Sequence, residues 1–200
     1  MTEATLKITP LNNAIRTIEI TFNNITDASE TIIKLMTQPD VPYKLEFIDS
    51  EAIILINKIK KNHYSDEAKY AVLLEIDGDI DYIEFAQQKI IKVIKSNKYN
   101  SISVASNKKE IENLWSARKS LSPALREIGK YKINEDIAVP ISNLAKLLKG
   151  LEDISKKYTI KMVNFGHAGN GNIHVNLLFD TVKEKESEKS KKCLNDIFDL

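Results

Sequence analysis

Apolar and polar positions alternate in short segments along this chain, and segments with helical spacing lie between them. Alternation is typical of strands that bury one face, whereas apolar residues three and four positions apart are typical of amphipathic helices. The pattern predicts strands over residues 4–8, 16–22, 43–48, 70–76, 101–105, 135–139, 161–165 and 172–178. It predicts helices that begin near Asp27, Ser50, Asp79, Asn107, Ser142 and Val182.

Residues able to cap a helix support several of these starts. Asp27 with Glu30, and Asp81 with Glu84, have the spacing of a capping box. Asn107 can accept a hydrogen bond from the free amides of a first turn.

The order of the elements predicts one α+β domain over residues 1–200, because no low-complexity linker interrupts it. Several helices are too short to close parallel crossovers, and some strands follow one another directly. We therefore expect a ferredoxin-like fold, with a largely antiparallel sheet and helices packed mainly on one face. Both faces of the strand over residues 70–76 are mostly apolar, with Glu75 on one of them, which indicates burial on each side.

Composition narrows the classes of partner. Lys and Arg total 29 against 28 Asp and Glu, so no excess of positive charge favours nucleic acid. The apolar runs are far shorter than the roughly 20 residues of a membrane span, and the N-terminus lacks the apolar core of a signal peptide. A single cysteine, Cys193, fits a reducing compartment, and we expect it to be chemically idle. A cytoplasmic location is expected.

The segment over residues 164–178 holds two of the three histidines, His167 and His174, among three glycines. In the strand that follows the glycines, Asn172 and His174 share the face opposite the apolar residues. Imidazole and carboxamide groups in such a row imply a binding site, because they are costly to bury without partners. The glycines let the chain fold back tightly, so that His167 can approach His174.

Three interpretations of this segment remain open on the residues alone. Two neutral imidazoles can share a divalent metal ion, although a third ligand is then required from elsewhere. A phosphate-binding loop is disfavoured, because a strand rather than a helix N-terminus follows the glycines. A glycine hairpin whose histidines form ordinary hydrogen bonds is the third.

Arg118 lies on the apolar stripe of a predicted helix, in line with Trp115 and Leu125. A guanidinium there needs an anion, which is either an internal carboxylate or the carboxylate of a substrate. We expect Pro123 to break or kink the helix and to leave the hydroxyl of Ser122 available beside Arg118.

The histidine segment resembles the Gly-His-x-Gly-Asp/Asn-Gly-Asn-x-His motif in the C-terminal domain of the flavin-linked oxidases. That family includes glycolate oxidase, D-lactate dehydrogenase and D-2-hydroxyglutarate dehydrogenase. The resemblance extends through residues 2–11, 114–125 and 135–140, and so covers nearly the whole chain.

The resemblance implies that His167 and His174 bind a divalent metal, zinc or manganese, with a third ligand from a Gly-Glu-His-Gly segment that lies beyond residue 200. It implies that Arg118, with Ser122 and Lys132, binds the carboxylate of a small D-2-hydroxy acid, and that Asn172 orients the hydroxyl. FAD would be bound mainly by a separate flavin-binding domain, so we expect these 200 residues alone to be inactive and not to retain the metal.

The complete enzyme would pass electrons to a separate acceptor protein or a quinone, at the inner face of the membrane or in the cytoplasm. Two alternative classes of function remain. One is a stand-alone ferredoxin-like module that binds a carboxylate metabolite without catalysis, and the other is an interaction protein without chemistry.

Overall fold

The computed structural model describes residues 2–6, 8, 12–61, 63–128 and 130–200. Its strands are β1 (Ala14–Phe22), β2 (Lys44–Ile48), β3 (Tyr70–Gly78), β4 (Ser101–Ala105), β5 (Tyr131–Ala138), β6 (Lys161–His167) and β7 (Asn172–Phe179). Its α-helices are α1 (Ile25–Thr37), α2 (Ser50–Lys60), α3 (Ile83–Lys95), α4 (Lys108–Ile128), α5 (Leu144–Tyr158), α6 (Val182–Lys185) and α7 (Glu188–Phe198). Short 3-10 turns, η1 (Ile141–Asn143) and η2 (Ala168–Asn170), precede α5 and β7.

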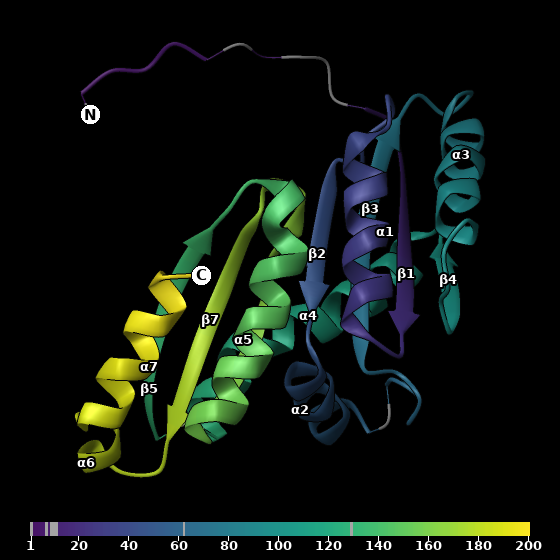
Figure 1. Ribbon diagram of the computed structural model, residues 1–200. Helices are drawn as coiled ribbons and strands as arrows, with labels where there is room; N and C mark the ends of the chain where they lie inside the picture. The colour runs from purple at the N-terminus through teal and green to yellow at the C-terminus, as the bar shows by residue number, and fades with distance from the viewer. Residues whose placement is uncertain (1, 7, 9–11, 62, 129) are drawn as a thin grey trace.

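All the strands belong to one seven-stranded sheet with the order β4-β1-β3-β2-β6-β7-β5, and every neighbouring pair is antiparallel. The first four strands, with α1 and α3, have the 4-1-3-2 order of a ferredoxin-like unit. The strands β6, β7 and β5 extend the same sheet beyond β2 (Figure 1). The predicted antiparallel α+β fold is confirmed.

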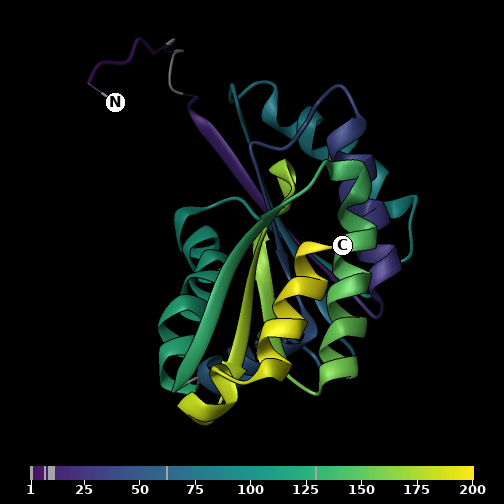
Figure 2. The ribbon, with the colours of Figure 1, turned by 60° about the vertical axis from the view of Figure 1, so that its left-hand side comes forward.

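Helices cover both faces of this sheet. The helices α1, α3, α5 and α7 pack on one face, and α2 and α4 pack on the other. The two layers are visible in Figure 2, where α4 lies on the opposite side of the sheet from α5 and α7. As predicted from its two apolar faces, β3 is buried along most of its length.

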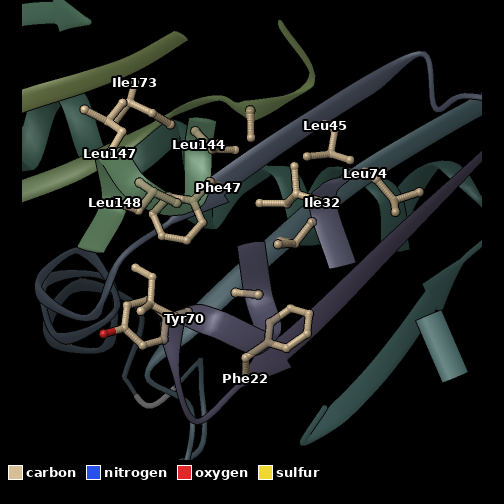
Figure 3. Close-up of a cluster of buried hydrophobic side chains, with 14 of the residues drawn as sticks. Phe22, Ile32, Leu45, Phe47, Tyr70, Leu74, Leu144, Leu147, Leu148 and Ile173 are labelled. Atoms are coloured by element: carbon tan, nitrogen blue, oxygen red, sulfur yellow. The ribbon is translucent and has the colours of Figure 1, made fainter. Parts of the chain in front are cut away.

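The larger core lies under α1, α3, α5 and α7. Phe22, Phe47 and Leu74 point from the strands toward Ile32 of α1 and Leu148 of α5 (Figure 3). Each of these side chains is buried, and full burial of a large apolar side chain contributes about 1.5–3 kcal/mol to folding. Cys193 of α7 belongs to the same core, where burial raises the pKa of its thiol to about 11.

Several helix starts differ from the prediction. Asn24, not Asp27, caps α1, and its side chain accepts from the Asp27 amide. The predicted box of Asp81 with Glu84 is also wrong, because α3 begins at Ile83 without a side-chain cap and Asp79 accepts from the Asp81 amide. Asn107 does accept from the Glu110 amide at the start of α4, as predicted.

Two further elements are corrected by the structure. The helix α4 continues through Pro123 instead of breaking at Ser122. A proline inside a helix costs about 3 kcal/mol, but Leu121, Ala124 and Leu125 are buried on either side of it and offset that cost. The strand predicted over residues 4–8 is absent at residues 4–6 and 8, and residue 7 lies outside the described part.

None of the helices in the described ranges combines the length and the apolar character needed to cross a bilayer.

Candidate functional site

The hairpin between β6 and β7 carries both histidines of the motif, His167 and His174. His167 is the last residue of β6 and pairs with Asn172 at the start of β7. Gly171 closes the turn with a φ of 74°, and a Cβ on it would lie 1.9 Å from the Val139 carbonyl oxygen. Only glycine satisfies both the left-handed backbone and this close approach.

The turn brings the two imidazole rings together. Their centroids lie 5.1 Å apart at an interplanar angle of 82°. His174 is also in edge contact with Phe165, its partner across β6 and β7, at 5.8 Å. The two imidazoles lie on one face of the sheet and are therefore close enough to contact the same small ligand.

Each histidine is held by a carboxylate at its Nδ1 atom. Nδ1 of His174 lies 2.5 Å from Oδ1 of Asp136, which is its cross-strand partner on β5. Nδ1 of His167 contacts Oε1 of Glu46 on β2. An ionised carboxylate only accepts hydrogen bonds, so each Nδ1 donates and a neutral ring keeps its free lone pair on Nε2.

Arg118 reaches the same group of side chains from α4. Its Nε atom donates to Oε2 of Glu46 at 2.8 Å, and its guanidinium carbon lies 4.4 Å from the centroid of the Phe165 ring. The internal carboxylate considered from the sequence is therefore present. The bond occupies one of the five N–H groups of Arg118, and within the described residues no further hydrogen bond of this side chain is found.

The remaining predicted site residues are placed less uniformly. Asn172 shares the face of His174, and its Oδ1 atom is buried without a hydrogen-bond partner among the described residues. Ser122 lies one turn beyond Arg118 on α4 and is exposed. Lys132 lies four residues before Asp136 on β5, roughly 13 Å along an extended strand, so the structure does not bring it to the histidines.

A cleft of about 290 Å³ opens beside His167. Its lining includes Tyr43, Lys44, Glu46 and Asn170. Lys44 forms an ion pair with Glu75 at 2.6 Å and lies over the ring of Trp115 on α4. Charged and aromatic groups thus continue along the sheet from the histidines toward β3.

The residues fit one half of a metal site. The two Nε2 lone pairs are suitable donors for a divalent ion, and the unpartnered Asn172 oxygen can accept a hydrogen bond from a ligand beside them. Catalytic zinc commonly takes three protein ligands, and the described ranges contain no group of three His, Cys, Asp or Glu side chains arranged to hold an ion.

Two members of this site were not predicted from the sequence. Glu46 is only 6% exposed, because α4 packs over its face of β2 and Arg118 pairs with it. Asp136 was not among the predicted site residues. The alternation of Glu46 with Leu45 and Phe47 places Glu46 on the face opposite the larger core, but only the strand order reveals that His167 and Arg118 lie beside it.

A family model described as FAD linked oxidases, C-terminal domain, matches residues 11–200. The glycolate oxidase subunit GlcD of Bacillus subtilis (strain 168) is 31% identical over 199 residues, which are 100% of this chain and 42% of that relative. The D-lactate dehydrogenase of Archaeoglobus fulgidus is 24% identical over 97% of this chain and 42% of its own length. The chain thus spans about two fifths of the length of these relatives.

Solved structures share the fold at low sequence identity. p-Cresol methylhydroxylase with substrate bound superposes with a TM-score of 0.69 at 11% identity, over 94% of this chain and 43% of that one. An alkyldihydroxyacetonephosphate synthase gives a TM-score of 0.65 at 13% identity, over 96% of this chain and 40% of that one.

Proposed function

This chain belongs to the family of FAD-linked oxidase C-terminal domains, and from that premise we propose that it is the substrate-binding part of a flavin-dependent dehydrogenase. The complete enzyme oxidises a small D-2-hydroxy acid, of the glycolate or D-lactate type, to the 2-oxo acid. The FAD-binding domain and the segment with the third metal ligand lie outside residues 1–200 in this proposal. The coverage of about two fifths of each relative supports it.

The observation that carries the proposal is the convergence of His167, His174 and Arg118 on one face of the sheet. A guanidinium recognises a carboxylate, and two neutral imidazoles recognise a divalent metal ion. A 2-hydroxy acid presents a carboxylate and an adjacent hydroxyl, so it matches both.

In this proposal each residue of the chain has a separate task. The N–H groups of Arg118 that Glu46 does not use bind the substrate carboxylate, with Ser122 as a second donor one turn away. Nε2 of His167 and Nε2 of His174 are two ligands of a zinc or manganese ion. The free Asn172 oxygen accepts from the substrate hydroxyl and orients it.

Bound metal would lower the pKa of the substrate hydroxyl, a base outside residues 1–200 would take its proton, and bound FAD would accept the hydride from the adjacent carbon. In this proposal, residues 1–200 orient the substrate. Arg118 and Asn172 hold the two ends of the reacting group, which fixes the direction in which its C–H bond points.

Anaerobic titration of the full-length, FAD-loaded protein tests the proposal. Glycolate or D-lactate should bleach the oxidised flavin absorbance, whereas L-lactate should not. p-Cresol is the matched comparison, because p-cresol methylhydroxylase has the same fold. Bleaching by the phenol and by none of the hydroxy acids would contradict the proposal.

A further inference from the structure

Glu46 has the more deeply buried side chain of the two acids that contact the motif histidines. This side chain is 9% exposed, whereas the side chain of Asp136 is 58% exposed. A buried carboxylate is stable only when its oxygens are paired, since desolvation of a lone charge costs several kcal/mol.

Both oxygens of Glu46 are used, and they are used by different partners. Oε2 accepts from Nε of Arg118 at 2.8 Å, and Oε1 contacts Nδ1 of His167. One residue of β2 thereby joins the end of β6 to the middle of α4. Among the described residues, no hydrogen bond joins His167 directly to Arg118.

We propose that Glu46 is a positioning residue that sets the geometry of His167 and Arg118 together. Its oxygen Oε1 keeps the proton of His167 on Nδ1 and directs Nε2 away from β2. Its oxygen Oε2 takes the Nε of Arg118, so that the two terminal nitrogens of the guanidinium project forward as a fork. Phe165 supports the flat face of that fork at 4.4 Å. The inference rests on the proposed function and adds the residue that couples its two binding groups.

Asp136 provides the matched comparison. It contacts Nδ1 of His174 at 2.5 Å, as Glu46 contacts His167, but in the described structure it has no hydrogen bond to Arg118. Both acids act on a histidine, and Glu46 alone of the two acts on the arginine. Their amide variants should therefore differ in one measurable property.

The experiment compares Glu46→Gln and Asp136→Asn in the full-length holoenzyme. Zinc affinity is measured by competition with a chromophoric chelator, and the affinity for pyruvate, a 2-oxo acid, is measured on metal-stripped enzyme. Arg118 and His167 contact different oxygens of Glu46, and glutamine replaces one of these oxygens by an NH2 group that only donates, so one of the two contacts loses its acceptor. Glu46→Gln should weaken zinc binding by about 10- to 100-fold, the usual effect of losing a residue that orients a ligand, and should also weaken pyruvate binding about tenfold.

Asp136→Asn should weaken zinc binding to the same extent as Glu46→Gln. It should leave the pyruvate affinity of the metal-stripped enzyme within about twofold of the wild-type value. Glu46→Asp keeps the charge and shortens the reach by one methylene, so it should show the same paired loss as Glu46→Gln. This second variant keeps the test decisive if removal of the charge prevents folding.

Equal pyruvate binding in wild type, Glu46→Asp and any folded Glu46→Gln would overturn the inference. Failure of the wild type to bind zinc would instead contradict the metal part of the proposed function, and the pyruvate measurement would still test the pairing of Glu46 with Arg118.

Discussion

The rings of His167 and His174 lie 5.1 Å apart at an angle of 82°, although seven positions separate them in the chain. The short turn at Ala168–Asn170 and the left-handed Gly171 make this approach possible. The sequence motif and the geometry thus indicate the same place for the proposed binding site.

Replacement of Arg118 tests its role as the carboxylate-binding residue. Arg118→Lys keeps the charge but loses the planar fork, so the full-length enzyme should show a KM for D-lactate raised about 10- to 100-fold. Lys109→Ala, in the exposed first turn of α4, is the control and should leave the KM unchanged. An unchanged KM in Arg118→Lys would remove Arg118 from the substrate site.

Replacement of Gly171 tests the turn. Gly171→Ala should lower the free energy of unfolding by about 2–4 kcal/mol, because a Cβ would meet the Val139 carbonyl oxygen at 1.9 Å on a backbone with φ of 74°. Gly78→Ala is the matched control, since its Cβ would find ordinary contacts at 3.8 Å or more. Urea denaturation of both variants measures the difference, and equal stabilities would show that the turn adapts to a side chain.

Asp49 links the stability of the domain to pH. It caps α2 and accepts from the Ala52 and Asn164 amides, but burial raises the pKa of its carboxyl from 3.8 to about 7. Between about pH 4 and pH 7, the Asp49 carboxyl is therefore protonated in the folded state and ionised in the unfolded state. The contribution of Asp49 is therefore full below about pH 4 and is lost as the pH rises toward 7, by about 4 kcal/mol at most.

Asp49→Asn should remove this dependence. Urea denaturation at about pH 4.5 and about pH 8, on either side of the shifted pKa, should show a smaller loss of stability with rising pH in Asp49→Asn than in the wild type. Asp66→Asn, at an exposed position, should behave as the wild type. The same pH dependence in Asp49→Asn and the wild type would rule out this role of Asp49.

Local patterns predicted much of the fold. The alternation over residues 101–105 gave β4 with its true ends, and Asn107 capped α4 as expected. The wrong predictions arose where tertiary packing overrides a local preference of the sequence. A proline at 123 is a local reason to end a helix, but packing of the buried residues around it keeps α4 continuous.

The candidate site was predictable only as far as it is local. The spacing of His167, His174 and the glycines lies within one hairpin, so the sequence indicated it. Glu46 lies 121 positions from His167 and 72 from Arg118, and no local pattern reports such pairs. They follow from the antiparallel contact of β2 with β6 and from the packing of α4 over both.

The central claim is that His167 and His174 bind one metal ion together, and metal affinity of the full-length protein tests it most directly. His167→Ala and His174→Ala should each lower zinc affinity about 100-fold or more in chelator competition, because each removes one ligand. His63→Ala, between α2 and β3, should retain wild-type affinity. Wild-type zinc affinity in either His167→Ala or His174→Ala would contradict the claim.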